Sequence, residues 1–413
     1  GLARDGTTIL AHGLAAIAAR GTANSTPMFL FIAGNSIAGA TASPTSAGVW
    51  LARRVNANVN RNTITRNSTG VRVESNARAF IGASAADANR ITANTGSGVV
   101  VGTTPASTAA ATIRFNDISD NGGLSIDIDD DGPTDPDVLD ADVERQNAPV
   151  ITRIVRSTGS AVVEGQVSGP ANAPATVDVY VTRRVDGRHR SEGAELLGTV
   201  LVTLPASGVS TFTFTIPRTL ASNDGVAATA TTTSTSEFSR PRADLALAVR
   251  ADPTFAATFQ EVSYLVTVTS PADAPANAFG TVTTLVFPPD TRITTSTCGT
   301  VSGVSATVVV NVPRGVNITC AVRVRSPTTG IKSVAASLVS PPEVLDPNLV
   351  NNAVTTLFNV NIDTRITLAG RVTRTAGTPA TPTTITLAGT SALTTTADAL
   401  GAYSFPNVPA GSY

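Results

Sequence analysis

Four tripeptides decide the fold: Asn35-Ser36-Ile37, Asn62-Thr63-Ile64, Asn89-Arg90-Ile91 and Asn116-Asp117-Ile118. Their Asn and their Ile each recur every 27 residues, and a second Asn keeps the same step at Asn67, Asn94 and Asn121. A glycine and an alternating apolar pair follow this second Asn, in Gly70-Val71-Arg72-Val73, Gly98-Val99-Val100-Val101 and Gly123-Leu124-Ser125-Ile126, and Gly48-Val49-Trp50-Leu51 fits the same place.

A unit of this size cannot bury its apolar face alone, so the repeats are expected to stack as coils. Each short strand then pairs in parallel with the same strand of the next coil, at a spacing of roughly 4.8 Å. The recurring Ile residues form an aliphatic column, and the recurring Asn residues form a ladder of amides at the corners. Sugar contacts are the alternative role for these Asn residues. Their equal spacing favours the structural ladder, because a binding site does not need a copy on every coil.

This pattern resembles a right-handed parallel β-helix, a fold of many secreted polysaccharide-processing and surface proteins, over about residues 1–128. With its acidic exit, the expected β-helix region covers residues 1–147. The chain begins with Gly1 rather than Met, and no cap precedes the first coil. We therefore expect further coils upstream in a longer precursor.

An acidic segment follows the last coil. Leu124, Ile126 and Ile128 are predicted to face inward, and Asp127 and Asp129 outward. The pattern Asp127-x-Asp129-x-Asp131-Gly132 matches the first half of a calcium loop, with Asp135 at its ninth position. The twelfth position is Val138 instead of Glu. The segment predicts either a structural calcium site or a solvated acidic loop that ends the repeat.

Short alternating strands with turn signals begin after Pro149 and predict a β-sandwich over residues 148–241. A second sandwich is expected over 242–361. It contains the only two cysteines, Cys298 and Cys320, beside strand-like sequence. A disulfide between them would stabilise the unit by roughly 3 kcal/mol and would indicate an oxidising compartment. Two buried free thiols are the alternative.

Two further resemblances concern these units. Ala243-Asp244-Leu245-Ala246-Leu247 and the turn at Asn351-Asn352 resemble the conserved-repeat β-sandwich of bacterial cell-surface proteins. Residues 362–413, which include Gly401-Ala402-Tyr403-Ser404-Phe405, resemble a truncated carboxypeptidase-regulatory-like sandwich. The expected fold class is thus all-β, a right-handed parallel β-helix followed by tandem immunoglobulin-like β-sandwiches.

The composition excludes several functions. The formal net charge is −1, which argues against a nucleic-acid binder. No apolar run is long enough to span a membrane as a helix. Only two histidines, His12 and His189, are present, which rules out a histidine-rich metal site and leaves little for histidine-based catalysis.

The leading hypothesis is an exported, extracellular structural and adhesion protein of the bacterial surface, whose coils bind a polysaccharide or a host or cell-surface glycan. The alternative is a polysaccharide lyase or glycosidase that acts on the face of the coils. Its candidate residues are Asp87, Arg90, Arg72, Arg66, Asp117 and Asp120. Glycoside hydrolysis needs two nearby carboxylates, and acidic residues are sparse in the coils. The sequence therefore assigns no catalytic residue.

Overall fold

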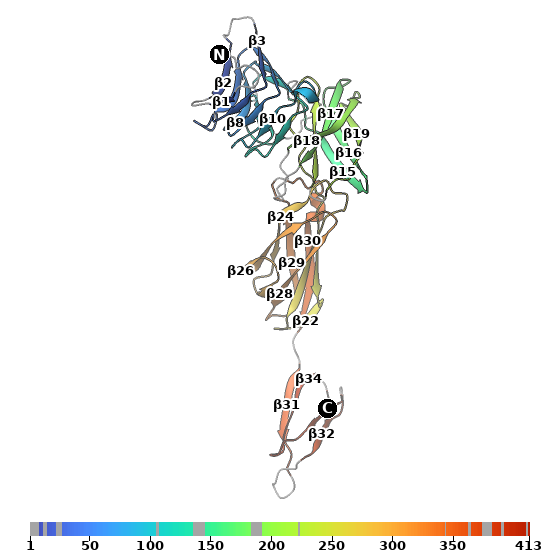
Figure 1. Cartoon of the computed structure of the whole chain (residues 1–413). Helices are drawn as coiled ribbons and strands as arrows, with labels where there is room; N and C mark the ends of the chain where they lie inside the picture. Colours follow the sequence, from blue (N-terminus) through green and yellow to red (C-terminus); the bar gives the residue numbers. More distant parts are fainter. Residues whose placement is uncertain are drawn as a thin grey trace.

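The computed structural model describes residues 8–10, 15–21, 27–104, 107–134, 145–182, 192–221, 224–342, 344–361, 365–373, 382–389, 392–409 and 412–413. These residues confirm the prediction of an all-β chain. They contain strands and two short 3₁₀ helices, η1 (Ala85–Asp87) and η3 (Leu349–Asn352), and no α-helix. Figure 1 shows an elongated molecule, with the N-terminal strands at one end and the C-terminal strands at the other.

Three parallel sheets make up the N-terminal part, which we call the coil stack (residues 8–128). The first sheet contains β1 (Thr8–Leu10), β4 (Ser36–Ala38), β7 (Thr63–Thr65), β10 (Arg90–Thr92) and β13 (Asp117–Ser119). The second contains β2 (Ala15–Arg20), β5 (Ala47–Ala52), β8 (Thr69–Glu74), β11 (Val99–Val101) and β14 (Ile126–Ile128). The third contains β3 (Met28–Ala33), β6 (Val55–Asn60), β9 (Arg78–Ile81) and β12 (Ala110–Ile113).

The repeat sets the register of these sheets. Ile37, Ile64, Ile91 and Ile118 lie opposite one another on neighbouring strands and are at most 1% exposed. Val49, Val71 and Val99 are likewise in register. Gly70 has no room for a side chain, since a Cβ atom there would lie 2.4 Å from the carbonyl oxygen of Gly98. Each coil therefore packs directly on the backbone of the next.

The last copy of the repeat differs from its prediction. Val99 pairs with Ile126, so the strand equivalent to Val99–Val101 is Ile126–Ile128, two residues beyond the start of the predicted Leu124–Ile126 stretch. The structure keeps the 27-residue step, whereas the glycine at Gly123 comes early in this copy. Leu124 is only partly buried.

The second unit consists of two three-stranded antiparallel sheets that enclose a common core. One sheet contains β15 (Val150–Ser157), β16 (Ser160–Ser168) and β19 (Val209–Ile216). The other contains β18 (Glu195–Thr203), β17 (Pro174–Thr182) and β20 (Gly225–Thr231). Val163 from the first sheet and Val177 from the second are fully buried in this core.

The third unit has a four-stranded and a six-stranded sheet. The smaller sheet contains β21 (Ala246–Asp252), β23 (Val262–Thr269), β28 (Asn317–Arg325) and β25 (Arg292–Ser296). The larger contains β22 (Phe255–Ala257), β30 (Ala353–Asn361), β29 (Gly330–Val339), β24 (Ala278–Val286), β27 (Ser305–Val312) and β26 (Thr300–Ser302). Tyr264 packs between Phe287 and Phe358 in the core, with ring centroids 5.2 and 6.3 Å away.

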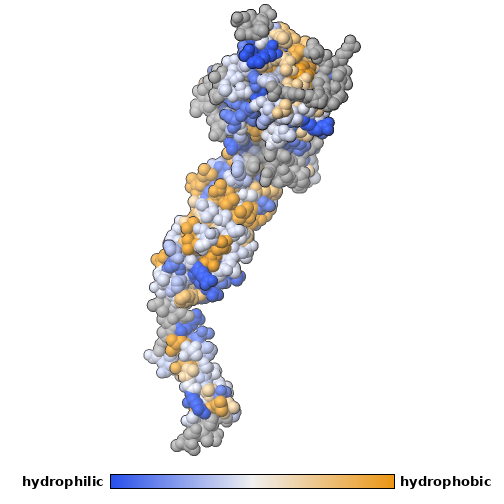
Figure 2. Space-filling model, turned by 90° about the vertical axis from the view of Figure 1, so that its left-hand side faces the viewer, coloured by the Kyte–Doolittle hydropathy of each residue, from blue (hydrophilic) through white to orange (hydrophobic). Residues whose placement is uncertain are grey.

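Two two-stranded sheets form the described part of the C-terminal unit: β31 (Ile366–Arg371) with β34 (Ala402–Val408), and β32 (Thr384–Leu387) with β33 (Leu393–Thr396). Hydrophobic patches lie among hydrophilic residues along the middle of the molecule (Figure 2). No helix in the described ranges has the length and apolar character needed to cross a membrane.

Candidate functional site

The coil stack and the second unit share one hydrophobic core. Tyr180 and Ala227, on β17 and β20, and Phe238 belong to the same buried cluster as the Ile and Val columns of the coils. The rings of Tyr180 and Phe238 meet edge to face, with centroids 5.2 Å apart. The buried core therefore includes residues on both sides of the predicted domain boundary at residue 147.

The second unit also meets the backbone of the last coil. The edge strand of a parallel sheet has backbone N–H groups without partners in the sheet. Burying such an N–H group without a hydrogen-bond acceptor costs free energy. Here Ile118 exchanges two hydrogen bonds with Gly193, of 2.8 and 3.1 Å. Four more backbone N–H groups donate to side chains of the second unit: Ile113 to Thr235 Oγ1, Phe115 to the Tyr180 hydroxyl, Asp120 to Glu192 Oε2 and Ile128 to Glu237 Oε1. We call this set of contacts the cap.

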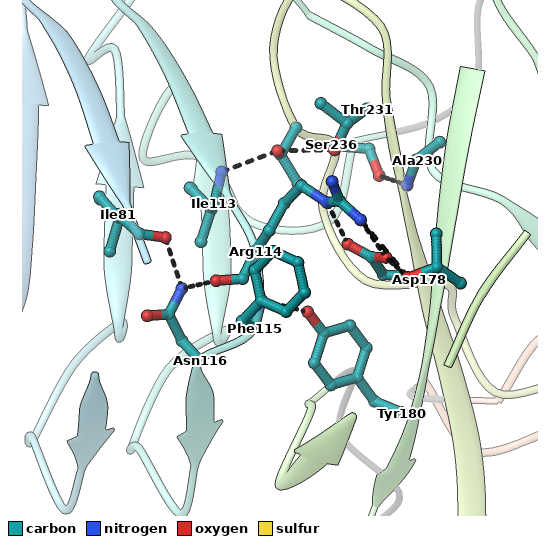
Figure 3. Close-up of polar contacts among 12 residues, drawn as sticks. Ile81, Ile113, Arg114, Phe115, Asn116, Asp178, Tyr180, Ala230, Thr231 and Ser236 are labelled. Carbon is teal, nitrogen blue, oxygen red and sulfur yellow. Dashed lines mark hydrogen bonds and ion pairs between the residues drawn. The ribbon is translucent and has the colours of Figure 1, made fainter. Parts of the chain in front are cut away.

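A buried ion pair holds the centre of the cap. Arg114 donates to both carboxylate oxygens of Asp178, at 2.6 and 2.8 Å, and Asp178 is fully buried (Figure 3). Thr199 donates a further hydrogen bond of 2.6 Å to the same carboxylate. The hydrogen bond to Asp178 raises the pKa of Arg114. The Arg114 side chain thus links the residue after β12 of the coils to β17 of the second unit.

Glu237 closes the cap on the side of the second parallel sheet. Its carboxylate accepts hydrogen bonds from the backbone N–H of Ile128 and from both the backbone and the hydroxyl of Thr134. Burial raises the pKa of Glu237 to about 7. This group therefore titrates near neutral pH.

Asp127 was predicted to face outward, into solvent. The structure shows instead that Asp127 is buried, with only 6% of its surface exposed. Its carboxylate accepts a hydrogen bond from Ser97 Oγ at 2.9 Å and one from the Gly132 N–H at 3.3 Å. Burial raises the pKa of Asp127. The alternation rule treats the outer face of a strand as open to water, whereas this face is covered.

Arginines pair with two further aspartates of the acidic segment. Arg145 donates to both oxygens of Asp129, at 2.5 and 2.6 Å, and Arg72 pairs with Asp130 at 2.9 Å. Asp131 is exposed, and Asp135 lies outside the described residues. Within the described ranges, no three His, Cys, Asp or Glu side chains gather as a metal-binding group. Both oxygens of Asp129 accept hydrogen bonds from the Arg145 guanidinium.

The recurring asparagines bond to one another. In the first column, the Asn35, Asn62 and Asn89 side chains each donate to the Oδ1 atom of the next Asn, ending at Asn116, over 2.8 to 3.1 Å. The same Oδ1 atoms accept the backbone N–H of the preceding Asn. All four residues are 2 or 3% exposed. These side chains therefore support the corners and are not available to a ligand.

Four of the six candidate residues of the enzyme hypothesis form local pairs. Arg90 lies 3.6 Å from Asp117 across β10 and β13. Asp87 accepts a hydrogen bond of 2.7 Å from Ser84, and Arg72 is buried against Glu74 and Asp130. Arg66 and Asp120 occupy left-handed positions in turns. His12 and His189 lie outside the described residues.

Cys298 and Cys320 are joined by a disulfide, with their Cα atoms 5.9 Å apart. The bond connects β28 to the segment between β25 and β26. It lies in the third unit and takes no part in the cap.

Reasoning from the sequence missed the cap. Tyr180, Gly193, Thr235 and Glu237 come from separate parts of the second unit and follow no common spacing. One signal was available: the open end of a coil stack must be covered, so the next unit had to supply acceptors.

No family model matches the chain, and no curated protein matches it. Among similar solved structures is a CARDB domain from Pyrococcus furiosus, described in complex with di-metal ions, with 14% identity over 29% of this chain and 90% of that chain and a TM-score of 0.23. Red sea bream transglutaminase has 18% identity over 52% of this chain and 31% of that chain, with a TM-score of 0.21. An alpha-2-macroglobulin of E. coli has 12% identity over 55% of this chain and 18% of that chain, with a TM-score of 0.21. This chain thus spans less than a third of the length of the latter two proteins. Similarities of this size assign the chain to no family.

Proposed function

We propose that residues 1–147 are a right-handed parallel β-helix, and that residues 148–241, 242–361 and 362–413 are immunoglobulin-like sandwiches that carry it. The parallel sheets with their 27-residue register support the first assignment. Paired sheets around common cores support the assignment of residues 148–241 and 242–361, and two antiparallel two-stranded sheets support that of residues 362–413. In this proposal the chain is an exported scaffold of the cell surface that presents the coils at the end of a rod.

The cap is the observation that carries this proposal. We call the coil stack the head and the sandwiches that carry it the stalk. A scaffold that presents the head in a fixed orientation needs a firm connection between the head and the stalk. The second unit shares the hydrophobic core of the coils and meets five of their backbone N–H groups. The coils and the second unit are therefore joined both by a common core and by backbone hydrogen bonds.

Export is supported by the disulfide between Cys298 and Cys320, because such bonds persist in oxidising compartments. The third unit also pairs directly with the second: Arg153 binds Asp273 at 2.7 Å, and the Ile154 N–H donates to the Asp273 carbonyl oxygen at 3.1 Å. These contacts extend the stalk beyond the cap.

The polysaccharide lyase or glycosidase remains the second candidate, on the strength of the Arg90–Asp117 pair on the face of the first sheet. The full chain incubated with a panel of polysaccharides distinguishes the two functions. We expect no new reducing or unsaturated ends, and small-angle scattering should show an extended particle. Release of such ends by the wild type, lost in Arg90→Gln and Asp117→Asn, would overturn the scaffold proposal.

A further inference from the structure

The outer face of the third parallel sheet holds three phenylalanine rings in solvent. Phe29, Phe31 and Phe80 are 76, 69 and 53% exposed. Their neighbours on the same strands, Leu30, Ile32 and Ile81, are buried in the core of the coils. Strand alternation therefore fixes the rings outward. Exposed rings gathered on one sheet indicate a binding surface more than an isolated exposed residue does.

The register arranges polar side chains between these rings. One row across β3, β6 and β9 reads Phe31, Asn58 and Phe80, and the neighbouring row reads Phe29, Asn56 and Arg78. Strands in a sheet are roughly 4.8 Å apart, so the rings of Phe31 and Phe80 are separated by about 10 Å along the stack. We call these six residues the ring-and-amide face. Its rows run along the axis of the coils, which suits a linear polymer.

The charge of the coils differs from that of the whole chain. Residues 27–115 contain eight arginines and two acidic residues, although the whole chain has a net charge of −1. Six of these arginines are exposed: Arg53, Arg54, Arg61, Arg66, Arg78 and Arg90. Arg54 and Arg61 lie at either end of β6, and Arg78 belongs to the ring-and-amide face. Figure 2 shows hydrophobic and strongly hydrophilic residues side by side at this end of the molecule.

We propose that the ring-and-amide face binds an anionic polysaccharide, laid along the axis of the coils. This rests on the proposed function, in which the coils are the presented head. The rings stack on the C–H faces of the sugars, the amides of Asn56 and Asn58 bond to hydroxyl groups, and the arginines pair with carboxylate or sulfate groups. The disulfide favours an extracellular polyanion over a nucleic acid.

Binding of polygalacturonate to the full chain, measured by calorimetry, tests the proposal. We expect the double variant Phe31→Ala, Phe80→Ala to bind at least about tenfold more weakly, because truncated aromatic anchors have effects of this size. Arg78→Gln should weaken binding and reduce its dependence on salt. Both changes lie on an exposed surface, so circular dichroism should show unaltered folding.

Matched controls come from the third unit. Phe255 is 65% exposed on β22, and the side chain of Arg250 is 70% exposed on β21. Phe255→Ala and Arg250→Gln should therefore bind as the wild type does. Neutral dextran should bind far more weakly than polygalacturonate.

Three results would overturn the proposal: no binding of polygalacturonate by the wild type, equal binding by the double variant, or stronger ring-dependent binding of poly(dT) or of phosphatidylglycerol vesicles. In each of these cases the scaffold proposal would still hold if no polysaccharide of the panel were cleaved and small-angle scattering showed an extended particle. Cleavage of polygalacturonate would instead refute the scaffold itself.

Discussion

Replacing Asp178 by alanine removes the acceptor that Arg114 needs inside the cap. Asp178 is fully buried, the Arg114 side chain is 22% exposed, and two short hydrogen bonds join them. Breaking a buried pair by deleting one partner costs about 3–5 kcal/mol, because a charge is left uncompensated. The residual exposure of Arg114 places the expected cost near the lower value, at about 3 kcal/mol.

Amide hydrogen exchange at the cap measures the free energy lost when the Arg114–Asp178 pair is broken. We expect the amides of Ile113, Phe115 and Ile118 to exchange faster in Asp178→Ala by roughly two orders of magnitude, which corresponds to about 3 kcal/mol. The amides of Val322 and Val324, in the core of the third unit, should keep their protection. The double variant Arg114→Met, Asp178→Leu should regain most of the lost protection, since apolar replacement of a whole pair is often neutral.

Two outcomes would refute this reasoning. Unchanged exchange at Phe115 in Asp178→Ala would mean that the pair does not hold the cap closed. A double variant as damaged as the single one would mean that packing volume, rather than the unpaired charge, is responsible.

Other predictions follow from the same contacts. The pKa of Glu237 is about 7 in the folded chain against an ordinary value of 4.5, so the folded state binds this proton more tightly and stability falls as pH rises between these values, by roughly 3 kcal/mol at most. Thermal melts from pH 4.5 to 7 should show this decline, and Glu237→Gln should flatten it. Asn89→Ala removes four hydrogen bonds and strands the buried N–H of Asn62, and should cost about 3 kcal/mol in denaturant titrations. Reduction of Cys298–Cys320 should lower the unfolding midpoint of the third unit by an amount equivalent to roughly 3 kcal/mol, with the coils unaffected. A chelator should leave the melting of the coils unchanged, because Arg145 binds both oxygens of Asp129; a lower midpoint would support the calcium site predicted from the sequence.

The coils could be predicted from the sequence because stacking makes distance along the chain equivalent to position in space. Ile64 and Ile91 are 27 residues apart in the sequence, and this spacing places them opposite each other on neighbouring strands. The cap has no such signal, since Tyr180 and Glu237 meet the last coil through tertiary packing alone. The burial of Asp127 was missed for a related reason: periodicity reveals which side of a strand faces the core, but not what covers the other side. The exposure of Phe29 and Phe31 was likewise not predictable, because every residue of Met28–Ala33 is apolar and no alternation marks the outer face.

The repeat joins one coil to the next, whereas the cap joins the last coil to the second unit. This division of roles affects how the number of coils can change in evolution. In the described residues, the asparagine contacts join each internal coil to its two neighbours, whereas the second unit meets the last coil. Duplication or loss of one 27-residue unit upstream therefore leaves every capping bond in place. It changes the length of the coil stack by one strand spacing, about 4.8 Å, and adds or removes one strand in each parallel sheet. Head length and surface area are thus quantities that recombination can adjust in discrete steps without redesigning the stalk.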